Sequence, residues 1–139
     1  MADLEQNKAV VDRFIREVFV EGRPEAVDEL VAEDFVPHTW GQMAEGRDGL
    51  RQAMERVARG VADARMTVED VIAEGDRVAV RLTSQARQVG ELMGMPPSGR
   101  EYRIEEIHIF RLRDGQIVEH WHQADFLGMM KQLGAMPGG

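Results

Sequence analysis

The sequence predicts an α+β fold in which three helices come first, a curved sheet of strands follows, and a short helix closes the chain. Three observations predict this order. Over residues 4–61, apolar residues recur at three- and four-residue spacing, which is typical of helices with one buried face. From Met66 to Gln123 the apolar residues instead alternate with polar ones, which is typical of strands. Because the helices precede the strands as a group, we expect them to cover one face of the sheet.

The first helix is expected over residues 4–20, because five apolar residues share one of its faces. Asp3 with Gln6 three residues later indicates a capping box at its start. A second helix is expected to begin at Pro24, and a third to run over 47–61. Between them, Asp34–His38 is expected to be extended, since a residue that precedes proline avoids helical angles. The shared face of the first helix holds Val10, Val11, Phe14, Ile15 and Val18.

The strands are expected near residues 66–72, 78–82, 102–112 and 116–123. Two glycines and two prolines lie within residues 92–99, which we therefore expect to form a loop. Two interpretations of this loop remain open: a lid hinged at Gly94 and Gly99, or a rigid turn held by its two adjacent prolines. The last helix is expected to start near Asp125, whose carboxylate suits a helix N-cap.

Composition excludes several classes of protein. The 139 residues allow one domain over 1–139. A formal net charge of −8 argues against nucleic-acid partners and against anionic lipid surfaces. Cysteine is absent, so disulfides and thiolate chemistry are excluded. The first five residues lack the pattern of a signal peptide and no apolar run reaches about 18 residues, so we expect a cytoplasmic protein with no membrane partner.

Three of the four histidines fall on the last two expected strands, and the turn between those strands decides which face each ring takes. A two-residue turn would pair Arg113 with Gln116 and place His108 opposite Trp121. A three-residue loop with Gly115 in a bulge would pair Leu112 with Gln116 instead. His108 would then lie opposite His120, and Glu106 opposite His122. One extra loop residue moves every side chain of a strand to the other face.

We favour the second register because it places the three histidines and Glu106 together on one face and a second set of apolar side chains on the other. The other face would hold Ile107, Ile109, Ile117 and Trp121. With helices on one side of the sheet, this second apolar face needs a cover, and we expect a homodimer through it. The inner face would hold Tyr102, Ile104, Glu106, His108, Phe110, Val118, His120 and His122.

Three imidazoles and one carboxylate among apolar groups are the composition of a ligand pocket. Imidazole titrates near neutrality and can give or take a proton, and Glu106 could orient His122 or raise its basicity. Two other interpretations remain open. The four groups could simply satisfy one another in a polar seam, or His120 and His122 with His108 and Glu106 could bind zinc.

Several segments carry a resemblance to a known family. The chain resembles the SnoaL-like polyketide cyclases of the nuclear transport factor 2-like superfamily over nearly its whole length, with the specific motifs in the C-terminal third. The segments that resemble the family are Asp34–His38, Gly94–Arg100, Glu106–His108, Asp114–His120, Asp125–Gly128 and Gln132–Gly134.

The resemblance implies a cone-shaped α+β barrel with a deep apolar pocket, usually dimeric or tetrameric. It also implies ring closure of a polyketide methyl ester by intramolecular aldol condensation, without metal or cofactor. His108 and His120 stand where the family has two pocket histidines. The family's acid/base aspartate stands two residues after the second histidine, where this sequence has His122.

We therefore expect a cyclase or isomerase that acts on a small apolar carbonyl compound. His122, assisted by Glu106, would remove an acidified α-proton, and His108 and His120 would hydrogen-bond the enolate oxygen. The alternative is a binding protein that holds a small apolar ligand in the same pocket without chemistry. A catalytic His122 should titrate near the working pH, which would distinguish the two. The expected substrate contacts are His38, Trp40, Tyr102, Phe110 and Met95.

Overall fold

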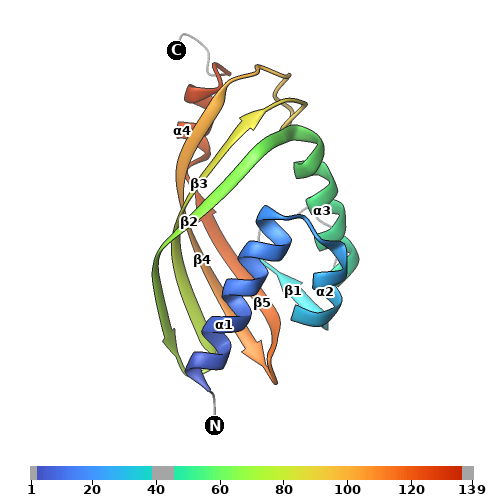
Figure 1. Cartoon of the computed structure of the whole chain (residues 1–139), viewed down its shortest axis with the longest axis vertical. Helices are drawn as coiled ribbons and strands as arrows, with labels where there is room; N and C mark the ends of the chain where they lie inside the picture. Colours follow the sequence, from blue (N-terminus) through green and yellow to red (C-terminus); the bar gives the residue numbers. More distant parts are fainter. Residues whose placement is uncertain (1–2, 39–45, 136–139) are drawn as a thin grey trace.

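The computed structural model describes residues 3–38 and 46–135 and confirms the α+β fold (Figure 1). The helices are α1 (Leu4–Phe14), η1 (Ile15–Val20), α2 (Pro24–Leu30), α3 (Gly46–Gly60) and α4 (Phe126–Gln132). The strands are β1 (Val31–Pro37), β2 (Val61–Glu74), β3 (Arg77–Gln88), β4 (Glu101–Arg113) and β5 (Gln116–Ala124). In the described part of the chain, no helix combines the length and the apolar character needed to cross a membrane.

The expected first helix has two parts. Asp3 caps its start, and the side chain accepts a hydrogen bond of 3.1 Å from the backbone N–H of Gln6. The α-helix ends at Phe14, and residues 15–20 continue as a π-helical turn. The Glu21 N–H accordingly donates to the carbonyl of Arg16, five residues back, at 3.0 Å. The sequence pattern predicted one uniform α-helix here and missed this change of period.

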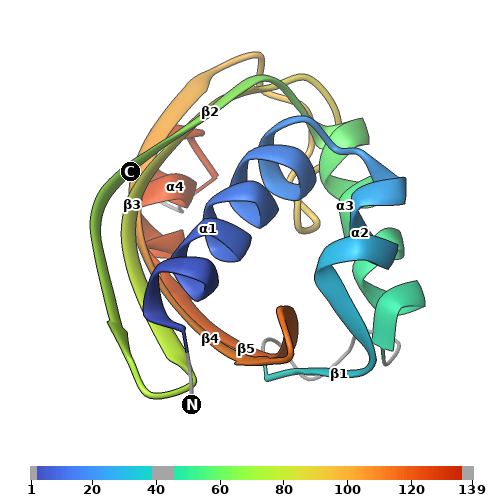
Figure 2. The same ribbon diagram turned by 60° about the horizontal axis from the view of Figure 1, so that its bottom comes forward.

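The sheet has five strands in the order β1-β5-β4-β3-β2. The last four strands of the chain form the expected antiparallel meander, whereas β1 pairs in parallel with β5. The segment expected to be extended before Pro37 is therefore an edge strand. The sheet curls around α1, and α2 and α3 lie beside β1 at the open side of the curl (Figure 2). The buried residues of α1 thus pack against the concave face of the sheet.

The hairpin between β4 and β5 has neither of the two expected registers. Asp114 and Gly115 both have positive φ angles, 52° and 78°, so the turn has two residues and Arg113 pairs with Gln116. A bulge follows: Leu112 pairs with Ile117, but Arg111 pairs with Glu119. Beyond the bulge the pairs are His108 with His122, Phe110 with His120, and Glu106 with Ala124.

The bulge explains what was right and what was wrong in the predicted register. A two-residue turn plus one bulged residue gives the same parity as a three-residue loop, so the three histidines share the inner face as expected. Their partners, however, are displaced by two residues. Ile117, which lies before the bulge, points inward and is fully buried, so its predicted place on the outer face is wrong. Ile107 and Ile109 do lie on the outer face, with 54% and 37% of their surface exposed.

The interior contains two apolar clusters. The larger joins α1, η1, α2 and β1 to the inner face of the sheet, with Phe14, Leu82 and Phe110 at its centre. The smaller lies at the other end of β4, where Tyr102 and Ile104 pack with residues of α4. The loop after β3 adds Leu92 and Met95 to the smaller cluster, which comprises Ala86, Leu92, Met95, Tyr102, Ile104, Met129 and Leu133.

One buried side chain holds the loop between β3 and β4. Gln88 is fully buried, and its Nε2 lies 3.1 Å from the carbonyl oxygens of Gly90, Met95 and Pro96. The Ser98 hydroxyl donates to Gln88 Oε1 at 2.6 Å. Of the two interpretations left open for this loop, the structure favours the rigid turn, and a side chain from the preceding strand fastens it.

Candidate active site

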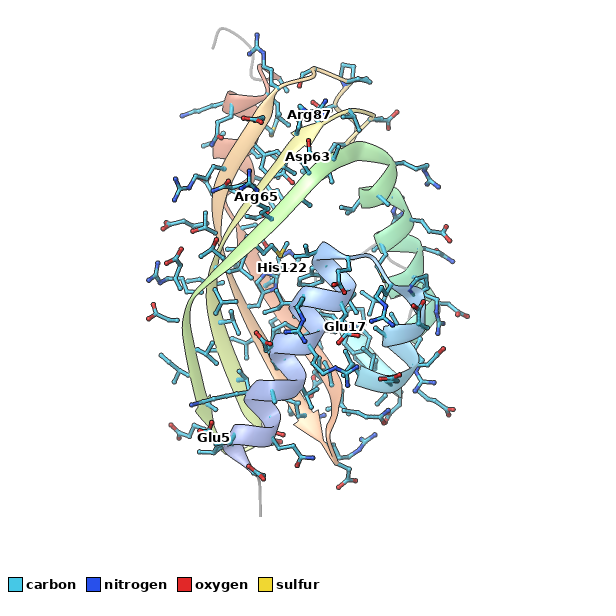
Figure 3. The ribbon with its side chains drawn as sticks, in the orientation of Figure 1. Glu5, Glu17, Asp63, Arg65, Arg87 and His122 are labelled. Carbon is cyan, nitrogen blue, oxygen red and sulfur yellow. The ribbon has the colours of Figure 1, made fainter. Side chains whose placement is uncertain are left out.

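The three histidine rings lie together on the inner face of β4 and β5. Figure 3 shows His122 on the concave side of the sheet, beyond the C-terminal part of the first helix. The ring centroids are 5.1 Å apart for His108 and His120, and 4.8 Å apart for His108 and His122. The third pair, His120 and His122, is 5.3 Å apart, and all three ring planes are parallel to within 12°. The sequence therefore predicted this grouping correctly.

A hydrogen-bonded chain runs through two of the rings. Glu106 Oε1 lies 2.7 Å from His108 Nε2, and His108 Nδ1 lies 2.8 Å from His120 Nε2. In the tautomer of His108 that carries its proton on Nε2, this nitrogen donates to Glu106, because an ionised carboxylate only accepts hydrogen bonds. The Nδ1 atom of His108 is then an acceptor for the Nε2–H of His120. The expected pairing of Glu106 with His122 is wrong, because the bulge places Glu106 opposite Ala124 and leaves its carboxylate beside His108.

This chain alters the expected role of His108. Both of its ring nitrogens already have partners within the protein, so His108 has no N–H left for an enolate oxygen. Its side chain is also 2% exposed, and His120 is 5% exposed. His122 is only half-buried. Of the three imidazoles, His122 is the most exposed.

Burial keeps His120 and His122 neutral. Burial and, to a smaller extent, the neighbouring His108 together lower the pKa of His122 to about 4, and the Glu106 carboxylate partly opposes this shift. Burial, together with His108 and His122, also holds the pKa of His120 well below the usual value for histidine. A neutral imidazole keeps a lone pair that can accept a proton. At neutral pH, His122 is therefore unprotonated and can accept a proton, but its pKa of about 4 lies well below the near-neutral titration that was expected from the sequence for a catalytic base.

The same rings supply the donor set of a zinc site. One nitrogen from each of His108, His120 and His122 lies within 4.8 Å of the others. Imidazoles that bind one ion direct their lone pairs at a common point. Here the ring planes are nearly parallel, and His108 Nδ1 and His120 Nε2 are directed at each other in a hydrogen bond. This geometry fits the hydrogen bond between His108 and His120, and the rings would have to rotate before they could bind a zinc ion together.

Three of the expected substrate contacts are buried. Tyr102 lies in the smaller apolar cluster, where burial raises the pKa of its hydroxyl and Ser84 hydrogen-bonds to it. Met95 lies in the same cluster and is 6% exposed. Phe110 has no exposed surface, because its ring packs against Phe14 and against His120. Phe110 thus supports His120 and does not face an accessible space.

His38, another of the expected substrate contacts, is not at this site. The His38 ring stacks on Trp121 with a centroid distance of 4.8 Å and hydrogen-bonds to Glu119 at 2.7 Å. Trp121 belongs to the outer face of the sheet, so the prediction that His38 lines the pocket is wrong. Its strand ends at Pro37, and the ring turns outward. Trp40 lies outside the described residues.

Sequence reasoning missed Phe19, which comes from the π-helical turn. Its ring lies 5.5 Å from that of His108 and 6.0 Å from that of His120. A helical pattern with 3.6 residues per turn does not place residue 19 on the apolar face, so the sequence carried no signal for it. One surface depression lies elsewhere, among charged residues of α2, β1 and α3, and does not include the histidines.

Comparisons with known proteins bear on the chemistry of this site. The family model described as SnoaL-like polyketide cyclase matches residues 9–133. The chain is 33% identical over 124 residues to the nogalonic acid methyl ester cyclase of Streptomyces nogalater, covering 84% of this chain and 89% of that protein. The structure of TsrD from Streptomyces laurentii superposes with a TM-score of 0.90 at 32% identity, covering 98% of this chain and all of TsrD. IdmH from Streptomyces antibioticus superposes with a TM-score of 0.81 at 33% identity, covering 93% of this chain and 99% of IdmH.

Proposed function

The chain belongs to the SnoaL-like polyketide cyclase family, and we propose that it closes a ring of a polyketide methyl ester by intramolecular aldol condensation. The name of its relative from Streptomyces nogalater supports the substrate class. The observation that carries the proposal is the half-buried, neutral His122 next to the chain formed by Glu106, His108 and His120. The phenylalanine rings next to His108 and His120 suit a substrate of low polarity.

His122 takes the first step. Its neutral ring removes a proton from a carbon flanked by carbonyl groups, which leaves an enolate and an imidazolium. A base with a pKa of about 4 has nearly the proton affinity of a carboxylate, the group that the family resemblance implies at this position. The difference lies in charge, because a protonated imidazole is a cation. The Glu106 carboxylate, which raises the pKa of His122, partly compensates that cation.

The ring closes in the second step. The enolate carbon attacks a second carbonyl group of the same substrate, so one carbon–carbon bond forms and that carbonyl oxygen becomes an alkoxide. The imidazolium of His122 returns its proton to the alkoxide, and the product is a hydroxy ketone with the same atoms as the substrate. His108 and His120 act as positioning residues that hold the Glu106 charge in place. General acid–base catalysis of this kind contributes roughly 10²–10⁴-fold.

Replacing the proposed base tests this function. With nogalonic acid or aklanonic acid methyl ester as substrate, His122→Ala should lower kcat roughly 10²–10⁴-fold, measured by chromatographic separation of the cyclised product. His122→Asp restores a proton acceptor and should keep most of the activity. Unchanged kcat in His122→Ala would contradict the assignment of the base.

Measurements on the parent protein distinguish a cyclase from a protein that only binds the ester. A chain that binds these esters in a fluorescence titration but forms no product after prolonged incubation would be a ligand-binding protein. Binding with turnover supports the cyclase.

We also propose that two copies of the chain associate through the outer face of the sheet. The exposed side chains of Ile107 and Ile109 support this proposal, because contiguous exposed apolar surface often marks an interface. Ile107→Glu combined with Ile109→Glu should convert a dimer into a monomer in sedimentation velocity. A parent protein that sediments as a monomer at concentrations of about 100 µM would argue against the dimer.

A further inference from the structure

The π-helical turn places Phe19 on the side of the first helix that faces the sheet. In a regular α-helix, a residue five positions after Phe14 would be rotated about 140° around the axis and would point away from it. A π-helical turn closes its hydrogen bond after five residues, so residue 19 returns to the side of residue 14. The two rings accordingly lie 4.9 Å apart, edge to face, at an interplanar angle of 71°.

Phe19 covers the hydrogen bond between the two buried imidazoles. Its ring centroid lies 5.5 Å from that of His108 and 6.0 Å from that of His120, with the planes tilted by 47° and 45°. Phe14 reaches only His120, at 6.3 Å. Phe19 is half-buried, whereas Phe14 has no exposed surface. Phe19 thus lies between the imidazole pair and the more accessible space beyond it.

We propose that Phe19 is a positioning residue of this site, whose ring keeps water from the His108–His120 hydrogen bond and so holds the chain from Glu106 to His120 in one tautomeric arrangement. Water that reached His120 could compete for its Nε2–H and solvate a protonated ring. The contribution of Phe19 to catalysis rests on the function proposed above, whereas the exclusion of water does not.

Within residues 3–38 and 46–135, few charged or titratable groups lie around His120. His108 and His122 face it from β4 and β5, and Glu106 acts through His108. From the helical side, Phe14 and Phe19 contribute only apolar rings. The nearest acid of η1, Glu17, has both carboxylate oxygens bound by Arg13 and Arg23. The surroundings of His120 on the helical side therefore depend on these two rings.

The test compares Phe19→Ala and Phe19→Leu with Phe35→Leu. Phe35 is 2% exposed in the same apolar cluster, on β1, and among the described residues it makes no ring contact with a histidine. Histidine nitrogen NMR would follow the exchange of the ring N–H proton between His108 and His120 with water, and the titration of His120. In Phe19→Ala we expect exchange at least 10-fold faster and a His120 titration midpoint at least one pH unit higher.

The matched variants separate exclusion of water from loss of packing. Phe19→Leu keeps an apolar cover and should retain slow exchange, and Phe35→Leu should lower Tm without changing the exchange or the titration. If Phe19→Ala lowers Tm while both NMR readouts stay at parent values, Phe19 is an ordinary packing residue and the proposal fails. If Phe19→Ala does not fold, Phe19→Val takes its place as the smaller truncation, and exchange and titration at parent values in that variant would overturn the proposal. These measurements use no substrate, so the absence of cyclase activity would leave this result standing.

Discussion

Two carboxylate–imidazole pairs lie on opposite faces of the same sheet, and the nitrogen–oxygen distance is 2.7 Å in both. On the inner face, the side chains of Glu106 and His108 are 12% and 2% exposed. On the outer face, those of Glu119 and His38 are 22% and 38% exposed. The two contacts have the same length, but the inner pair is less exposed to solvent than the outer pair.

The difference shows that solvent, and not contact distance, sets what each pair can do. Around the outer pair, the hydrogen bond from His38, followed by that from Arg111, lowers the pKa of Glu119, and water screens the charges. Such exposed pairs stabilise a fold by about 0–1 kcal/mol. The inner pair is shielded by apolar rings, so loss of its charge leaves a buried polar group without compensation.

The largest expected effect comes from removing the inner charge. Glu106→Gln keeps an acceptor for His108 but removes the charge that offsets a cation on His122, so we expect kcat to fall roughly 10²–10⁴-fold. Steady-state assays with the methyl esters would measure it. The matched control is Glu119→Gln on the outer face, which should change kcat by less than about twofold. If kcat fell equally in Glu106→Gln and Glu119→Gln, the two faces of the sheet would not differ in their importance for catalysis.

A smaller effect is expected on acid stability. His122 has a folded-state pKa of about 4, below the ordinary value of 6.5, so the unfolded chain binds a proton first as the pH falls. Stability is fully present above about pH 6.5 and declines as the pH approaches 4, and His120 acts in the same direction. Between pH 7 and 4.5, Tm of the parent should fall by roughly 5 °C more than Tm of His122→Asn. Identical slopes in a calorimetric pH series would contradict a buried, neutral His122.

The smallest effect is expected on the outer face. His38→Ala removes the bond to Glu119 and the stacking on Trp121, but Arg111 still neutralises Glu119, and Arg77 still lies 5.2 Å from the Trp121 ring. Urea denaturation should show a loss below about 1 kcal/mol, with kcat unchanged. A loss above about 2 kcal/mol would show that the outer pair is as important to the fold as the inner one.

Hydrophobic periodicity in the sequence was sufficient to predict the α+β order. The residue types at the helix starts predicted the cap at Asp3 and the N-cap at Asp125, whose side chain accepts from the Gly128 N–H at 2.8 Å. It also predicted that His108, His120 and His122 share one face, since that depends only on the parity of the hairpin connection. These are local properties, carried by spacing along one segment.

The tertiary structure decided which groups touch. The bulge in β5 paired His108 with His122 and Glu106 with Ala124, and the π-helical turn brought Phe19 over the imidazole pair. Each is a shift of one residue in a regular element, and which shift occurs depends on packing against segments distant in the chain. His38 likewise faces outward because β1 joins the edge of a sheet whose other strands begin 23 or more residues later. The sequence by itself determined that the three imidazoles share the inner face, because that depends on local spacing and parity, and packing between distant segments determined their contacts.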